Sequence, residues 1–152
     1  MAGRKTLALV VALAAALLAT LATTAEARSS ASAYKVGIIY SRTGLLASYG
    51  AQYIEGLRLG LSYATKGTNK VGGHPLELAL QDDAGNPTTA VSAAKDLIGQ
   101  GYKILAGSTA SGVALQVAPI AAQNQVLFIS GPAASDAITG VNKYTFRSGR
   151  QS

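Results

Sequence analysis

Three times along this chain, a short apolar run is followed by a segment whose apolar residues recur at helical spacing. The first run, residues 34–40, is almost continuously apolar and rich in β-branched residues, as in a strand covered on both faces. In the segment 49–65 that follows, Glu55 and Arg58 face away from the apolar stripe. That stripe consists of Ile54, Leu57, Leu61 and Ala64. The two segments predict one β-strand followed by one α-helix.

The second repeat has the clearest helix signals. Residues 75–83 alternate leucine with other residues and predict a strand. Asn86 and Pro87 come next, and asparagine is favoured as an N-cap while proline is favoured in the first helical turn. Gly99 or Gly101 is expected to end this helix. The predicted buried stripe consists of Ala90, Val91, Ala94, Leu97 and Ile98.

The rest of the chain continues the alternation. Residues 102–106 predict a third strand, residues 112–123 a helix, residues 126–130 a fourth strand and residues 143–148 a last strand. Strands alternating with helices of this length predict the α/β class, with a parallel sheet flanked by helices on both faces. The 152 residues are 49% hydrophobic and only 13% charged, which suits one folded domain.

The loops after three strands carry the main clue to function. In parallel sheets, ligands bind at the carboxyl ends of strands, next to helix N-termini. The most informative loops of this chain, residues 41–50, 107–112 and 131–135, all follow predicted strands. They are rich in Gly, Ser, Thr and Ala, which let a ligand approach the backbone closely.

The first 33 residues have the pattern of an exported protein. Basic Arg4 and Lys5 precede an apolar run over residues 7–18, and the small residues Ala25 and Ala27 flank Glu26. We interpret residues 1–27 as a signal peptide that is cleaved after Ala27, since the run is shorter than the roughly 20 residues of a membrane span. Residues 28–33 are expected to form a flexible lead, and residues 34–152 the folded domain. The chain has no cysteine, so it forms no disulfide.

Several function classes have little support. The net charge is +6, but the basic residues are dispersed, which argues against a nucleic-acid partner. Both phosphate-loop fingerprints are absent. The single histidine, His74, is expected to be exposed in a Gly-Gly turn, away from any candidate nucleophile. Asp82 and Asp83 are adjacent and so point apart, without His or Cys partners for a metal. We therefore expect no enzyme activity, no metal and no cofactor.

Two residues of the loops suit a small ligand. Ser111, at a predicted helix start, offers its N–H and hydroxyl where the helix dipole favours an anion such as a carboxylate. Tyr49 offers an aromatic wall for an apolar side chain. Each has an alternative interpretation: Ser111 as a simple helix cap, and Tyr49 as ordinary packing at a helix start.

Four stretches of the chain resemble a known family. They are VGIIYSRTGLLASYGAQYIEGLRLGLSYA, LELALQDDAGNPTTAVSAAKDLI, ILAGSTASGVALQVAPIAAQNQVLFIS and YTFRS. Together they are similar to the periplasmic leucine/isoleucine/valine-binding protein family. The resemblance implies a bilobed type I periplasmic binding fold, with ligand held between the lobes.

The resemblance also implies residue roles. Ser111 stands where the family binds the ligand's carboxylate, and Tyr49 where an aromatic residue lines the side-chain pocket. Ala133 and Ser135 match a turn that supplies a carbonyl and a hydroxyl, although Ser135 replaces the commoner threonine. The family's serine-rich stretch is reduced here to residues 110–112, which leaves amides, aromatic acids and urea-like compounds open as ligands.

The implied function is the extracytoplasmic solute-binding component of an ABC importer for branched-chain amino acids or related small molecules. Its implied partners are the ligand and membrane permease subunits, and its implied location is the periplasm. Residues 34–152 match only the first lobe, so we expect an N-terminal fragment in which the second lobe is absent. Two alternatives stay open: a ligand-sensing domain of a receptor or regulator, and a non-functional half receptor.

Overall fold

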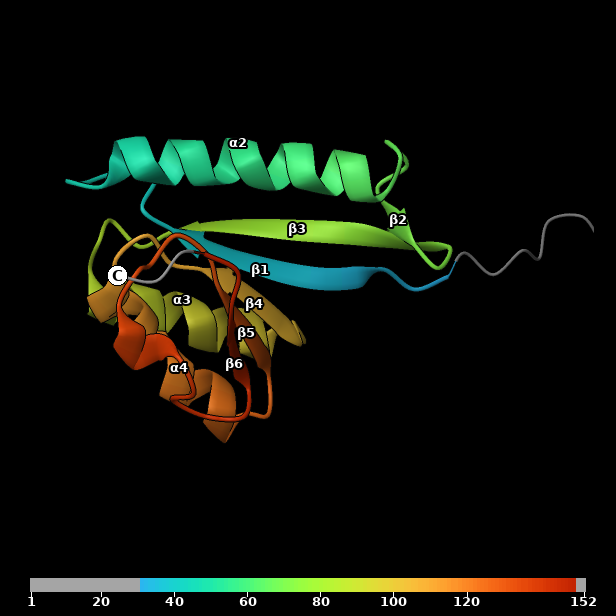
Figure 1. Cartoon of the computed structure of the whole chain (residues 1–152). Helices are drawn as coiled ribbons and strands as arrows, with labels where there is room; N and C mark the ends of the chain where they lie inside the picture. The colour runs from blue at the N-terminus through green and yellow to red at the C-terminus, as the bar shows by residue number, and fades with distance from the viewer. Residues whose placement is uncertain (1–30, 150–152) are drawn as a thin grey trace, which may run out of the picture. The chain divides into compact units, whose positions relative to one another are not determined.

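Residues 31–149, which the computed structural model describes, form a six-stranded sheet with helices on both faces (Figure 1). The strands are β1 (Tyr34–Tyr40), β2 (Lys70–Val71), β3 (His74–Asp82), β4 (Ile104–Gly107), β5 (Leu127–Ser130) and β6 (Thr145–Arg147). The helices are α2 (Ala47–Ala64), α3 (Pro87–Gly99), α4 (Ser111–Gln123) and the short 3-10 helix η1 (Asp136–Ile138). The predicted α/β class is confirmed. The expected signal peptide lies outside the described residues, as does the first half of the expected flexible lead.

The sheet order is β2-β3-β1-β4-β5-β6, and five of its strands are parallel. The exception is β2, which pairs antiparallel with β3 and was not predicted. It is only two residues long, so no alternation could reveal it. Its hairpin turn uses Gly72 and Gly73, whose φ angles are +57° and +86°. A two-residue turn with positive φ at both positions favours glycine. The Gly72-Gly73 pair was therefore the feature of the sequence from which this hairpin could have been predicted.

Helix α3 confirms the predicted start. The side-chain oxygen of Asn86 accepts hydrogen bonds from the N–H groups of Thr88 at 2.8 Å and Thr89 at 3.2 Å. Pro87 occupies the first turn, and the helix ends at Gly99. The predicted stripe is partly right: Ala90, Ala94 and Leu97 are buried, and Val91 and Ile98 are half-buried.

Helix α2 departs more from its prediction. It begins at Ala47, two residues before the expected start, and buries only Gly50 and Ile54. Leu57 and Leu61 are half-buried, and Ala64 is exposed, so the predicted stripe is wrong at its end. The reason is that α2 lies alone on its face of the sheet, with no helix beside it (Figure 1).

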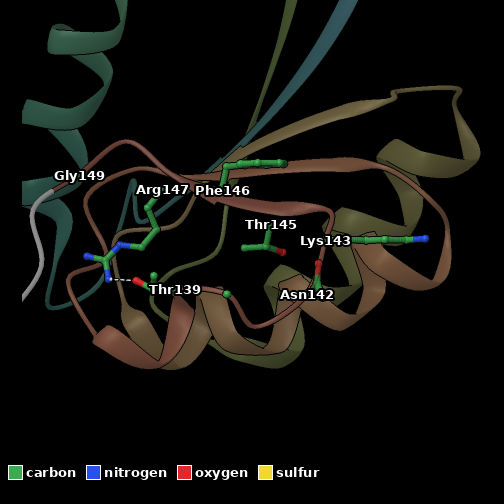
Figure 2. A pocket seen from close by; sticks show the side chains of 8 residues that line it. Thr139, Asn142, Lys143, Thr145, Phe146, Arg147 and Gly149 are labelled. Carbon is green, nitrogen blue, oxygen red and sulfur yellow. Dashed lines mark hydrogen bonds between the residues drawn. The ribbon is translucent and has the colours of Figure 1, made fainter.

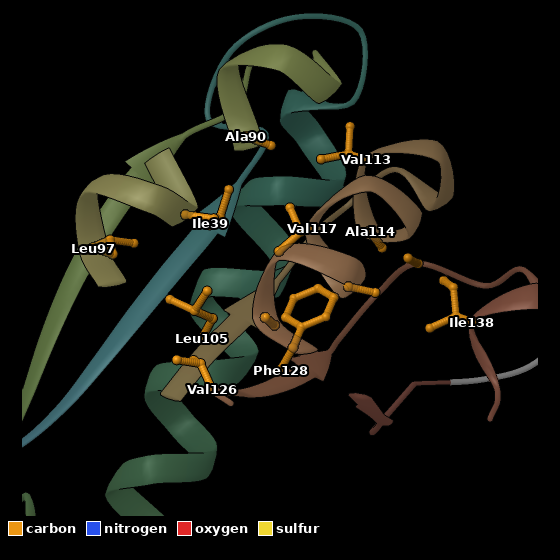
Figure 3. Packing of buried hydrophobic residues seen from close by; sticks show 14 of the residues in the cluster. Ile39, Ala90, Leu97, Leu105, Val113, Ala114, Val117, Val126, Phe128 and Ile138 are labelled. Carbon is orange, nitrogen blue, oxygen red and sulfur yellow. The ribbon is translucent and has the colours of Figure 1, made fainter. Parts of the chain in front are cut away.

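The main core lies between the sheet and helices α3 and α4, on the opposite face from α2 (Figure 3). Its largest fully buried side chains are Ile39, Leu97, Leu105, Val113, Val117, Val126, Phe128 and Ile138. Small residues such as Ala94, Ala114 and Ala121 let the two helices approach the sheet closely. A smaller cluster under α2 contains Ile38, Tyr40, Ile54 and Ala106.

The parallel register brings the carboxyl ends of the central strands to one edge. Tyr40 of β1 lies beside Asp82 of β3, and Gly107 of β4 beside Ser130 of β5. The loops that leave these strands therefore gather at this edge, as predicted. None of the described helices is both long and apolar enough to cross a membrane.

Candidate functional site

Ser111 is the first residue of α4 but is not its cap. The N-cap position belongs to Ala110, whose backbone is extended and whose side chain makes no capping bond. The cap interpretation of Ser111 is therefore wrong. A helix start without a side-chain acceptor keeps its N–H groups and its positive dipole end available to an anion. Ser111 itself is half-buried.

Ser111 and Ser135 lie together, although they belong to different loops. The Ser135 N–H donates a hydrogen bond of 3.2 Å to Oγ of Ser111, which joins the loop after β5 to the start of α4. The structure thus brings together two of the four residues predicted for the site. Because the Ser111 hydroxyl accepts this bond, its own hydrogen stays free to point toward an acceptor such as a carboxylate oxygen.

Ser135 and Ala133 play different parts in the loop after β5. The Ser135 hydroxyl accepts a 3.3 Å bond from the Ala137 N–H and caps η1. Ala133 is 1% exposed and belongs to the core against α4. Its side chain anchors the loop, so only its backbone remains for the predicted contact.

Arg147 holds the same loop and was missed by the sequence analysis. Its Nη1 donates to the carbonyl of Ser135 at 2.8 Å and to Oγ1 of Thr139 at 3.1 Å, and its Nη2 donates to the carbonyl of Ala134 at 3.2 Å. Figure 2 shows the guanidinium reaching Thr139 from β6. A lone arginine on a short strand gave no pattern from which this clamp could be predicted.

A hollow of about 460 Å³ lies along β6, beside this clamp (Figure 2). Asn142, Lys143, Thr145, Phe146 and Arg147 are among its lining residues. None of the four predicted site residues lines it. The hollow is therefore distinct from the pair formed by Ser111 and Ser135.

Tyr49 lies in the first turn of α2 and is 59% exposed. Ordinary packing at a helix start does not account for so exposed a ring, so that interpretation is wrong. Among residues 31–149, no hydrogen bond or ring contact joins Tyr49 to Ser111 or Ser135. The structure therefore leaves Tyr49 accessible without placing it against the serine pair.

Asp82 organises the loop between β1 and α2. Its carboxylate accepts hydrogen bonds from the N–H groups of Arg42, Thr43 and Ala84 and from the Thr43 hydroxyl, at 2.7–3.2 Å. Burial by itself raises the pKa of Asp82, but the hydrogen bonds from Thr43, Ala84 and Arg42 outweigh it and lower the pKa overall. The Arg42 side chain adds an ion pair of 3.8 Å, weak because Arg42 is 68% exposed.

Asp83 lies directly after β3 and is fully buried. Its two carboxylate oxygens accept bonds of 2.7 Å from the hydroxyls of Ser41 and Ser108, and one of them also accepts from the Gly85 N–H at 2.7 Å. The two aspartates have no hydrogen-bond donor in common, and each one holds a loop of the site. No local pattern in the sequence indicated these roles.

His74 differs from its prediction. It begins β3, is half-buried and stacks on Tyr34 with ring centroids 4.6 Å apart, where a solvent-exposed turn residue was expected. A ring nitrogen lies 2.8 Å from the carbonyl oxygen of Ser32. His74 therefore belongs to the amino end of the sheet, opposite the loops of the site. Within residues 31–149, no three acidic or histidine side chains cluster closely enough to hold a metal ion.

Comparison with known proteins gives consistent matches. The profile of a family described as periplasmic binding protein matches residues 33–152. A Leu/Ile/Val-binding protein of Rhizobium johnstonii is 36% identical over 107 residues, which cover 68% of this chain and 28% of that protein. The matched part of the chain thus spans 28% of the length of each of two curated relatives.

Solved structures agree with the sequence matches. An ABC-type branched-chain amino acid transporter structure from Rhodopseudomonas palustris is 38% identical, with a TM-score of 0.74 over 78% of this chain and 33% of that one. A solute-binding protein of an ABC transporter from the same species, in complex with 3,4-dihydroxy benzoic acid, is 33% identical, with a TM-score of 0.71 over 78% of this chain and 32% of that one.

Proposed function

Because this chain belongs to the periplasmic binding protein family, we propose that it forms the first lobe of the solute-binding component of an ABC importer. In this proposal it binds a branched-chain amino acid or a related small carboxylate or amide and performs no chemistry on it. The bound ligand is then delivered to the membrane permease subunits of the importer. Closure of two lobes around the ligand is the conformational change that delivery requires.

The pairing of Ser111 with Ser135 is the observation that carries this proposal. The two residues come from loops after neighbouring strands and meet at a helix start that no side chain caps. Hydroxyl and backbone N–H groups at such a position suit a carboxylate, because the helix dipole adds partial positive charge without a basic side chain. Ser135 and the backbone of Ala133 extend the same site.

The relatives support a carboxylate as the common feature of the ligand. One relative is named for leucine, isoleucine and valine, and another structure contains 3,4-dihydroxy benzoic acid. These compounds differ in their apolar parts but share a carboxylate. We infer that the carboxylate binds at Ser111, while the exposed ring of Tyr49 contacts the apolar part of the ligand.

The second lobe is proposed to be encoded beyond the residues of this sequence. The support is that the part matched here covers only 28% of one relative and 33% of another. The test is to read the gene past the codon for Ser152. An open frame with a further β/α domain is expected, and a stop codon at that point would contradict a two-lobed receptor.

The family places this protein in the periplasm. We propose that residues 1–27 direct its export and are removed after Ala27. The mass of the protein recovered from the periplasm of an expressing cell tests this cleavage. A mature N-terminus at Arg28 is expected, and a protein that keeps Met1 would contradict it.

Substitution of Ser111 by alanine tests the binding site itself. Titration calorimetry of the full-length protein with leucine, isoleucine, valine and 3,4-dihydroxybenzoate first identifies the compound that binds. Ser111→Ala is then expected to weaken its binding by about tenfold, the effect of losing a hydrogen bond to a charged group.

Ser92→Ala is the matched control, because Ser92 is an exposed serine on helix α3. This control is expected to bind as the unsubstituted protein does. Equal affinities for Ser111→Ala and Ser92→Ala would contradict the proposed site.

A further inference from the structure

Asp83 is a fully buried carboxylate that lies directly after β3, at the edge of the sheet where the site is built. Among residues 31–149, no lysine or arginine forms an ion pair with it. A buried carboxylate without a cation is costly unless hydrogen bonds compensate its charge. Hydrogen-bond donors, and not a basic side chain, therefore compensate the charge of Asp83.

Those donors come from three different loops. Ser41 belongs to the loop after β1 and Ser108 to the loop after β4, and their hydroxyls each donate to a different oxygen of Asp83 at 2.7 Å. Gly85, from the loop after β3, adds a backbone N–H at 2.7 Å. Hydrogen bonds to an ionised carboxylate are short and strong, so this one side chain fixes the spacing of three strand ends.

A second contact joins two of these loops directly. The Ser41 N–H donates a bond of 3.3 Å to Oγ1 of Thr109, next to Ser108. Gly107, just before Ser108, has φ +123°, and a Cβ there would lie 1.8 Å from the Ile39 carbonyl oxygen. The start of the loop after β4 is thus pressed against β1 and tied to Asp83.

We propose that Asp83 is a positioning residue for ligand binding: through Ser108 and Ser41, it holds the loop that presents Ser111 to the ligand. Ser111 lies three residues after Ser108 and begins α4. A shift of Ser108 moves the first turn of that helix, and with it the hydroxyl that Ser135 and the ligand share. This inference rests on the proposed function for its effect on affinity, but not for its effect on the geometry of Ser111.

Ser108→Ala is the sharpest test, because it removes one donor and leaves the buried carboxylate in place. Ser130→Ala is its matched control: Ser130 is fully buried at the end of β5, beside Gly107, and its hydroxyl has no hydrogen-bond partner. The affinity for leucine or 3,4-dihydroxybenzoate, whichever the full-length protein binds, is measured for both variants below their unfolding temperatures.

Ser108→Ala is expected to weaken binding by about tenfold, and Ser130→Ala by less than about twofold. The conservative variant Asp83→Asn is expected to keep most of the affinity. Its amide oxygen still accepts from Ser41 and Gly85, and its amide N–H donates to the Ser108 hydroxyl. Recovery in Asp83→Asn distinguishes positioning through hydrogen bonds from a need for the negative charge.

A second readout needs no ligand. The backbone amide resonances of Ser111 and Gly112, measured by NMR, are expected to shift in Ser108→Ala and to stay in place in Ser130→Ala. Equal affinities and unmoved Ser111 resonances in Ser108→Ala would overturn the inference. If the unsubstituted protein binds neither probe, the proposed ligand class fails. The resonances of Ser111 and Gly112 then decide the positioning role by themselves.

Discussion

The two faces of the sheet differ sharply in how well they are covered. On the face of α3 and α4, Leu97, Leu105 and Phe128 are at most 1% exposed. On the face of α2, Leu80 remains 40% exposed and Phe146 58%. Both faces carry apolar side chains, so composition does not explain the difference. Two helices with small residues against the sheet seal one face, whereas one helix leaves the other partly open (Figures 1 and 3).

This contrast indicates which face of the sheet contributes more to the stability of the described residues. Burial of apolar area stabilises in proportion to the area removed from water. The cluster under α3 and α4 is large and continuous, whereas the cluster under α2 has four buried members, of which only Ile38 is fully buried. We therefore expect substitutions on the first face to cost much more than equivalent substitutions on the second.

The chain's two phenylalanines test the contrast with the largest expected effect. Phe128 on β5 is fully buried against α4, and Phe146 on the neighbouring β6 is 58% exposed. Phe128→Ala is expected to lower the free energy of unfolding by about 3–5 kcal/mol, since it leaves a cavity in a packed core. Phe146→Ala is expected to cost less than about 1 kcal/mol.

Urea unfolding followed by circular dichroism measures both values. Similar losses for the two variants would mean that the face of α2 is packed as tightly as the other, and the contrast would have to be abandoned.

Two glycines of α2 provide a test of intermediate size. A Cβ on Gly50 would lie 1.9 Å from the Ser41 carbonyl oxygen, whereas a Cβ on Gly60 would meet nothing within 4 Å. Gly50→Ala is expected to destabilise by about 1–3 kcal/mol, because the start of α2 must move away from the loop after β1. Gly60→Ala is expected to stabilise by about 0.5–1 kcal/mol through its higher helix propensity.

Thermal unfolding of the two variants checks this pair. If Gly50→Ala proved as stable as Gly60→Ala, α2 would have no fixed contact with the site edge of the sheet.

Tyr53 offers the smallest effect, a loss of stability that occurs only at alkaline pH. It extends from α2 toward Gly131, where a Cβ would lie 2.6 Å from the Tyr53 ring. Burial raises the pKa of Tyr53 from 10.0 to about 12. Its contribution to stability is thus complete below pH 10 and is lost as the pH rises toward 12, where the buried phenol ionises.

Ultraviolet titration of phenolate absorbance tests this prediction by difference. Tyr53→Phe is expected to remove one phenol that ionises above pH 10. The pKa of Tyr102, which its hydrogen bond to Glu77 and its burial raise, is expected to stay the same. A difference titration centred near pH 10 would mean that Tyr53 is solvated and that α2 does not bury its ring.

The elements that were predicted correctly have local signals. The strand β1 and the start of α3 at Asn86 and Pro87 depend on residues within a few positions of each other. The missed elements β2 and η1 are two and three residues long, too short for either periodicity. The family resemblance was also correct, because it rested on a pattern spread over almost the whole described domain.

The ligand-binding roles of the four predicted site residues stay predictions. Two of these residues, Ser111 and Ser135, are neighbours in space, because loops after adjacent parallel strands meet at one edge. Asp83 and Arg147 were missed as organisers of those loops. Their partners Ser41, Ser108 and Ser135 lie 42, 25 and 12 positions away in the sequence, so no local pattern connects them.

The sequence by itself determined the alternation of strands and helices, the capped start of α3 and the set of small-residue loops at strand ends. These features follow from interactions between residues a few positions apart, which a linear sequence displays. Only the tertiary structure decided that Asp83 is buried while its neighbour Asp82 faces the loop after β1, and that the face of α2 stays partly open. Burial depends on which distant segments pack together, and that is settled by the register of the whole sheet.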